Sequence, residues 1–231
     1  MNPILKRTLT GLAVGAAVIA AVLVAPSAAI APAVACLAVL AVVEYAILLG
    51  LRLRRWSMAW CFALLAGAAV IVCGLGAMPR IAALYAGRTC GGVALGNLMV
   101  LYAVATIKFS DVGCFSFGVT SQKLMKGGNH KLCPTISPNK SWEGLAGSVF
   151  ASCLVSCCFA GVTGFGLAKS LALGAMAALV GTFGDLVESR FKRWVGVKDS
   201  SAMKFTNGLG GFLDMFDSLL FALPAFLAFL P

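Results

Sequence analysis

Acidic residues are scarce in this sequence, which has eight of them in 231 residues against 18 lysines and arginines. Charged residues make up 11% of the chain and hydrophobic residues 61%, and the mean hydropathy is +0.98. These values exclude an ordinary soluble domain and are typical of a polytopic membrane protein. The net charge of +10 comes from short loops between apolar segments. Binding to nucleic acid is therefore not expected.

Cysteine and histidine motifs that bind metals are also lacking. The nine cysteines and the single histidine, His130, show no CxxC pair and no Cys/His ligand spacing. Most cysteines, such as Cys61, Cys73 and Cys153, fall inside apolar segments, so we interpret them as packing residues rather than disulfides or zinc ligands. His130 lies in a basic loop, where a solvated side chain is a better interpretation than a catalytic base.

Long apolar segments are what the sequence has in abundance. Each is near the ~20 residues that a helix needs to cross a bilayer core. We expect an all-α integral membrane protein, one bundle over residues 1–231 with about seven transmembrane helices and at most nine. The first segment resembles a signal peptide, but the similar segments that follow favour a first span. The predicted spans are residues 8–25, 31–51, 57–77, 95–121, 143–163, 168–190 and 210–230.

Basic residues predict the orientation of these spans. Clusters at residues 6–7, 52–55, 123–140 and 190–204 face the cytoplasm by the positive-inside rule, and Arg80 and Arg88 remain for an outer loop. Residues 95–121 must then form one span. Within it, Lys108 and Asp111 should share a face near the cytoplasmic end, because they are three positions apart.

The few acids converge at that same level. A carboxylate at the centre of a membrane helix costs about 3 kcal/mol, so these acids need cationic partners. Glu44 stands apart from them in an earlier span, and Asp199 lies in a loop. The acids predicted at one cytoplasmic depth are Asp111, Glu143, Asp185, Glu188, Asp214 and Asp217.

Spacing within the two last spans sharpens this prediction. Asp185, Glu188, Ser189 and Lys192 form one helical stripe, and Asp214 and Asp217 form a second pair one turn apart. Paired carboxylates repel unless a cation lies between them. Salt bridges to Lys192, Arg193 or Lys198 are one explanation. The explanation we favour is Mg²⁺, one ion or two, because Mg²⁺ is usually held by one or two carboxylates together with substrate phosphates.

The loop at residues 126–144 is basic, rich in glycine and proline, and ends at a helix N-terminus, where backbone N–H groups attract anions. It fits a phosphate-bearing substrate, and it fits equally an ordinary positive-inside loop.

Several motifs resemble those of one enzyme family. Residues 137–144, SPNKSWEG, resemble the S-P-K-K-T-W-E-G element of phosphatidate cytidylyltransferases, the CDP-diacylglycerol synthases. Residues 111–118 resemble the D-x-x-A-Y-x-x-G stretch of that family, and residues 131–134 its K-L-x-P. Residues 184–189, 192–193, 198–200 and 210–218 follow its C-terminal signature in order. The resemblance covers about residues 100–222, so 95–231 is the expected catalytic half and 1–94 contributes amino-terminal helices.

Two departures stand inside the signature. The usual P-G-H-G-G becomes Asn207-Gly-Leu209-Gly-Gly211, and the usual D-R-x-D becomes Asp214-Met215-Phe-Asp217. A histidine and an arginine are therefore missing, which puts in doubt a mechanism that needs that histidine as base. The metal-binding carboxylates of the pattern are all present.

The resemblance implies an enzyme that transfers CMP from CTP to phosphatidate, giving CDP-diacylglycerol and pyrophosphate at the cytoplasmic face of the inner membrane. A homodimer is a further expectation for a bundle of this size. The implied catalytic residues are Asp185, Lys192, Asp214 and Asp217. The implied substrate-binding residues are Ser137, Lys140, Ser141, Glu143, Ser189, Arg193, Lys198 and Asp199. The implied Mg²⁺ ligands are Asp214, Asp217, Asp185, Asp111 and Glu188.

Three alternatives stay open. A related CTP-dependent lipid or prenol phosphotransferase would share the substrates in part. A cation-coupled transporter would place its carboxylates near the bilayer midplane and show inverted repeats, and the sequence indicates neither. An inactive homologue is suggested by Leu209 and Met215.

Overall fold

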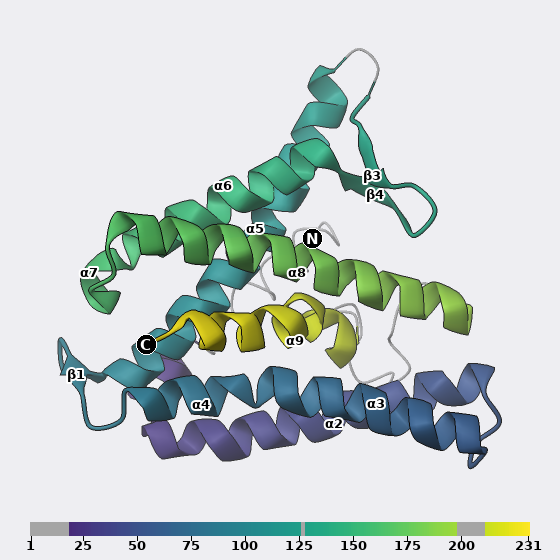
Figure 1. Cartoon of the computed structure of the whole chain (residues 1–231), viewed down its shortest axis with the longest axis horizontal. Helices are drawn as coiled ribbons and strands as arrows, with labels where there is room; N and C mark the ends of the chain where they lie inside the picture. The colour runs from purple at the N-terminus through teal and green to yellow at the C-terminus, as the bar shows by residue number, and fades with distance from the viewer. Residues whose placement is uncertain (1–18, 126–127, 198–210) are drawn as a thin grey trace, which may run out of the picture.

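The computed structural model describes residues 19–125, 128–197 and 211–231 (Figure 1). Within these residues, two small antiparallel hairpins interrupt a series of helices. The helices are η1 Ser27–Ala29, α2 Ile30–Arg52, α3 Met58–Leu75, α4 Ala77–Leu84, α5 Leu95–Leu124, α6 Trp142–Cys158, α7 Ala160–Thr163, α8 Leu167–Val195 and α9 Phe212–Phe229. The hairpins pair β1 Thr89–Cys90 with β2 Val93–Ala94, and β3 Lys131–Cys133 with β4 Ser137–Ser141.

Five helical stretches in the described part of the chain are long and apolar enough to cross a membrane. They are Ser27–Arg52, Met58–Leu84, Leu95–Leu124, Leu167–Val195 and Phe212–Phe229, and α6 is a shorter apolar helix. These helices indicate an integral membrane protein. Six of the seven predicted spans thus correspond to helices, but the first lies largely outside the described residues. The expected count of seven to nine transmembrane helices is more than the described residues show.

The third predicted span departs from the structure. The third span continues past Leu75 with only a break at Gly76, so Arg80, which we assigned to an outer loop, lies within α4. Arg88 lies in the turn between α4 and β1, where its carbonyl accepts a hydrogen bond from the backbone N–H of Leu95. The apolar pattern could not reveal this break because alanine, glycine and leucine continue across it.

Helix α9 lies at the centre of the arrangement, between α8 on one side and α2 with α3 on the other (Figure 1). Helices α5, α6 and α8 pack against one another through small residues, as is common in membrane bundles. A Cβ on Gly113 of α5 would collide with the backbone of Gly147 in α6. A Cβ on Gly184 of α8 would lie 2.6 Å from the carbonyl oxygen of Asp217 in α9.

A buried aromatic centre fixes these helices relative to one another. The Tyr102 ring of α5 packs edge-on against Phe226 of α9, with centroids 5.0 Å apart. Its hydroxyl lies 2.6 Å from Ser156 Oγ in α6, and that serine donates to the carbonyl of Ser170 in α8. Four helices are therefore joined at one point, and Asp111 lies about 13 Å further along α5 at ~1.5 Å per residue.

Candidate active site

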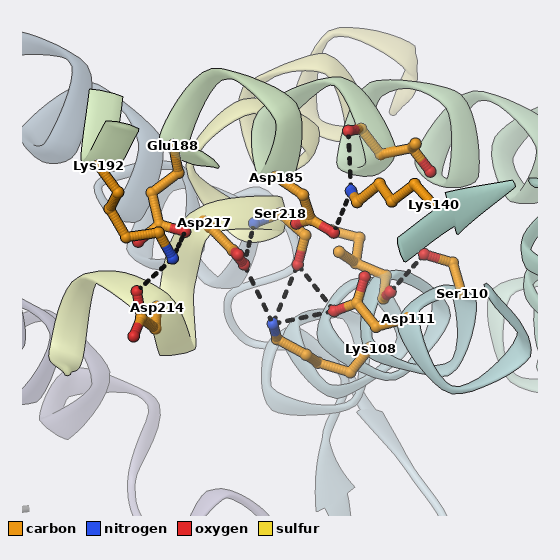
Figure 2. A network of polar contacts seen from close by, with 12 residues as sticks. Lys108, Ser110, Asp111, Lys140, Asp185, Glu188, Lys192, Asp214, Asp217 and Ser218 are labelled. Carbon is orange, nitrogen blue, oxygen red and sulfur yellow. Dashed lines mark hydrogen bonds and ion pairs between the residues drawn. The ribbon is translucent and has the colours of Figure 1, made fainter. Parts of the chain in front are cut away.

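Lysine and acidic side chains from α5 and α9 meet in a polar network (Figure 2). Lys108 Nζ donates to Asp111 Oδ2 at 3.1 Å and to Ser218 Oγ at 2.9 Å, and it lies 4.0 Å from Asp217 Oδ1. Ser218 Oγ donates in turn to Asp111 Oδ2 at 2.9 Å. Lys108 and Asp111 share one face of α5 because they are three positions apart, and they meet Asp217 and Ser218 of α9 across the helix interface.

A second ion pair joins the β3–β4 hairpin to α8. Lys140, the residue before the last of β4, donates from Nζ to Asp185 Oδ2 at 2.8 Å and to the Thr182 carbonyl at 3.3 Å. Only 14% of its side chain is exposed. The next residue, Ser141, ends the strand and caps α6, because its Oγ accepts from the backbone N–H of Gly144 at 3.0 Å. This cap joins the end of β4 to the start of α6, and so it holds the backbone beside Lys140 in place.

A third group joins α8 to the first turn of α9. Lys192 Nζ lies 2.8 Å from Asp214 Oδ1 and 3.2 Å from Glu188 Oε2. Asp214 Oδ2 also accepts from the backbone N–H of Gly211, the residue that precedes α9. In Figure 2, Asp217 lies between this group and the Lys140–Asp185 pair. One network thus runs across α5, α8, α9 and the end of β4.

The predicted convergence of acids is largely what the structure contains. Five of the six acids assigned to one level take part in the network: Asp111, Asp185, Glu188, Asp214 and Asp217. No basic residue lies close to Asp214 and Asp217 along the chain, yet Lys192 and Lys108 approach them from other helices. Salt bridges, the explanation we did not favour, are therefore part of the arrangement. Within the described residues, no group of three or more acids, cysteines or histidines has the arrangement of a metal site.

Glu143 makes its contacts elsewhere, at the start of α6. Its carboxylate accepts from the His130 ring Nδ1 at 2.6 Å and from the His130 backbone N–H at 3.1 Å. The hydrogen bond from the ring, aided by backbone N–H groups of Glu143 and His130, lowers the pKa of the Glu143 carboxyl to about 2. Glu143 therefore closes the β3–β4 loop onto α6, and 74% of the His130 side chain remains exposed.

The other predicted site residues have less defined surroundings. Ser137 starts β4 opposite Cys133, and Ser189 is half-buried on α8. Arg193 is exposed in the last turn of α8. Lys198 and Asp199 lie outside the described residues, as does Leu209.

Three residues of the site were not predicted as members of it. Lys108 was assigned to the correct face, and a lone lysine in an apolar span was the signal that could have marked it. Ser218 follows Asp217 directly in the C-terminal motif. Glu44, the acid that stood apart in the sequence, is 1% exposed and accepts from the backbone N–H of Leu213 in α9. That contact joins residues 169 positions apart, so no local pattern could indicate it.

The sequence is similar to those of known proteins. The profile of the cytidylyltransferase family matches residues 83–231. The chain is 43% identical over 127 residues to a protein of Staphylococcus aureus (strain COL) named phosphatidate cytidylyltransferase, a match that covers 54% of this chain and 46% of the relative. Proteins of the same name are 42% identical over 127 residues in Staphylococcus saprophyticus and 40% over 131 residues in Staphylococcus epidermidis, with 46% and 47% of those chains covered.

The chain thus matches about half the length of these relatives. The family profile spans more than half of the present sequence, from just before the β1–β2 hairpin to the end of α9. It includes every member of the polar network. The chain belongs to the cytidylyltransferase family.

Proposed function

We propose that this protein is a phosphatidate cytidylyltransferase, which converts CTP and phosphatidate to CDP-diacylglycerol and pyrophosphate. The observation that carries this proposal is the Lys140–Asp185 ion pair of 2.8 Å, with Lys108, Asp111 and Asp217 beside it. Apart from Lys108, these residues come from four motif segments that are separated in sequence, 111–118, 137–144, 184–189 and 210–218, and they lie in one partly buried polar network. The name shared by the Staphylococcus relatives supports the same substrates.

The reaction makes limited demands on protein groups. A phosphate oxygen of phosphatidate, already anionic at neutral pH, attacks the α-phosphorus of CTP, and the bond to the β-phosphate oxygen breaks to release pyrophosphate. No strong protein base is needed, so the loss of the family histidine at Leu209 does not prevent this step. The protein has to align two polyanions and neutralise their charge.

Two lysines are suited to that task. An ammonium group has three N–H donors. Lys140 uses two of them for Asp185 and the Thr182 carbonyl. Lys192 points two toward Glu188 and Asp214. Each lysine can therefore offer a remaining donor to a phosphate oxygen while its ion pairs hold it in place, and the exposed Arg193 adds charge nearby.

Two buried carboxylate oxygens of the network are available to a magnesium ion, although the described side chains do not form a metal site as they stand. Asp185 Oδ1 and Glu188 Oε1 are buried without a hydrogen-bond donor among the described residues, although the second oxygen of each group contacts a lysine. Buried carboxylate oxygens without donors are suited to a hard cation. Asp185, Glu188, Asp214 and Asp217 would hold it, with Asp111 beside them. When bound, Mg²⁺ neutralises charge on the phosphoryl oxygens and on the leaving pyrophosphate.

The proposal places this network at the cytoplasmic side of the membrane. The supporting argument is the positive-inside rule, because Arg52, Arg54 and Arg55 and the basic β3–β4 loop lie at the same end of their helices as the acids. CTP would arrive from the cytoplasm, while the acyl chains of phosphatidate remain in the inner leaflet.

Product analysis tests the reaction. The purified chain in detergent, supplied with phosphatidate, CTP and Mg²⁺, should form CDP-diacylglycerol and pyrophosphate in equal amounts. We expect Asp217→Asn to lower the rate at least ~100-fold, in the range found when charge stabilisation is removed.

Lys169→Met is the matched control, since Lys169 contacts the Phe165 ring at the opposite end of α8. A CTP-dependent kinase would release CDP instead of pyrophosphate. Absence of CDP-lipid, or a full rate in Asp217→Asn, overturns the proposal.

A further inference from the structure

Lys108 contacts two acids that come from different helices, Asp111 of α5 and Asp217 of α9. Its ammonium contacts Asp111 Oδ2 at 3.1 Å, Ser218 Oγ at 2.9 Å and, at 4.0 Å, Asp217 Oδ1 (Figure 2). Ser218 is fully buried and also donates to Asp111, so the serine and the lysine hold the same carboxylate oxygen. Three oxygen atoms from two helices therefore lie within 4.0 Å of the nitrogen.

This is the environment of a bound cation. Asp111 and Asp217 come from different helices that both fit a membrane span, and two carboxylates brought together there repel each other unless positive charge lies between them. Lys108 and Asp111 lie three positions apart on one face of α5, so the helix itself places the ammonium next to the Asp111 carboxylate. Gly181 of α8 also faces this group, because a Cβ on it would lie at an ordinary contact distance of 3.5 Å from Ser218 Cβ.

We infer that the Lys108 ammonium is a built-in cation of this site, which occupies the position between Asp111 and Asp217 that would otherwise require a bound ion. Asp111 is then the partner of the lysine. The acids left for an exchangeable divalent ion are Asp185, Glu188, Asp214 and Asp217, which now contact lysines and would have to turn toward the ion. The centre needs one exchangeable ion instead of two. The identity of that ion as Mg²⁺ rests on the proposed function, whereas the role of Lys108 does not.

The first test measures stability without substrate. Lys108→Ala removes the ammonium and leaves space for a small cation. We expect its melting temperature in detergent to fall by roughly 5 °C or more and to recover with added K⁺, NH₄⁺ or propylammonium in a saturable manner at constant ionic strength. Tetramethylammonium, which is too large, should not restore it. The wild type and the control Lys169→Ala should be indifferent to the identity of the cation. A folded Lys108→Ala variant without a saturable cation response overturns the inference.

A second variant separates charge from packing. Lys108→Met fills a similar volume without charge, so it should stay destabilised and should not respond to K⁺. If Lys108→Met is as stable as the wild type, the lysine acts only by packing and the inference fails. Should Lys108→Ala not fold, the double variant Lys108→Met/Asp111→Asn removes the charge at both positions. It should be more stable than Lys108→Met alone, and equal or lower stability contradicts the inference.

Activity gives an independent readout. The wild-type rate should follow Mg²⁺ as a single-site curve without a requirement for K⁺, whereas Lys108→Ala should require K⁺ or propylammonium in addition. A cooperative Mg²⁺ curve in the wild type argues for two exchangeable ions and against the inference. The two proposals fail separately, because the stability response needs no turnover. If Lys108→Ala responds to cations but the wild type forms no CDP-lipid, only the proposed reaction is overturned. If the wild type turns over but Lys108→Ala shows no cation response, only the role of Lys108 is overturned.

Discussion

The Glu44 carboxylate of α2 accepts a 2.8 Å hydrogen bond from the backbone N–H of Leu213 in the first turn of α9. The first N–H groups of a helix have no partner within it, and their partial positive charge favours an anion. Glu44 supplies that anion from a helix that lies outside the family match, which begins at residue 83. The amino-terminal half thereby fixes the start of the helix that carries Asp214 and Asp217.

Replacing Glu44 should therefore affect both stability and turnover. Glu44→Leu leaves the Leu213 N–H buried without an acceptor, at a cost of about 1–3 kcal/mol, and frees the first turn of α9. We expect a lower melting temperature in detergent and a lower kcat. Glu44→Gln is the control, because its amide oxygen can still accept the bond and should retain most of the activity. Equal activity and stability of the leucine variant would show that the contact does not position α9.

Lys140 should contribute to turnover beyond its ion pair. Lys140→Met leaves Asp185 without its lysine and removes a phosphate donor, so we expect kcat/KM for CTP to fall by roughly 100-fold or more. Lys140→Arg keeps the charge but changes the donor geometry and should be intermediate. Lys123→Met, at an exposed position near the end of α5, should have little effect. If Lys140→Met lost only thermal stability while kcat/KM held, the lysine would be structural.

The contact between Gly184 and α9 predicts a strict size limit next to Asp185. Alanine there would place Cβ 2.6 Å from the carbonyl oxygen of Asp217 and 3.0 Å from the Phe221 ring. Since the carbonyl belongs to the backbone, the two helices must separate, and overpacking of this kind costs about 1–3 kcal/mol. Gly184→Ala should lower the melting temperature and the rate together. Gly161→Ala, where a Cβ would meet nothing within 4 Å, should change neither, and a fully active Gly184→Ala variant would contradict the predicted contact.

The sequence predicted the helices better than the contacts between them. The predicted spans 95–121 and 168–190 correspond to α5 Leu95–Leu124 and α8 Leu167–Val195, because long apolar runs define membrane helices. Neither hairpin was predicted: the strands of β1–β2 have two residues each, and β3–β4 lies in the segment that we interpreted as a loop. Spacing grouped Asp214 with Asp217, and Lys192 was one of three named candidates for a salt bridge. Spacing could not reveal that Lys192 is the partner of Asp214 or that Lys108 approaches Asp217. Those pairings depend on how helices pack, which the pattern within one helix does not contain.

The Glu143–His130 contact predicts a pH response of the β3–β4 hairpin. Its hydrogen bonds lower the pKa of Glu143 to about 2 in the folded protein, compared with 4.5 ordinarily. A depressed pKa means that the contact contributes stability above about pH 4.5, and that this contribution declines as the pH falls toward 2. Hydrogen exchange of the hairpin amides, corrected for intrinsic rates, should show protection at pH 6 that decreases over this range. Glu143→Gln should be less protected at pH 6 and change little on acidification. If both proteins lost protection in parallel, the loop would be held by contacts other than the Glu143 carboxylate.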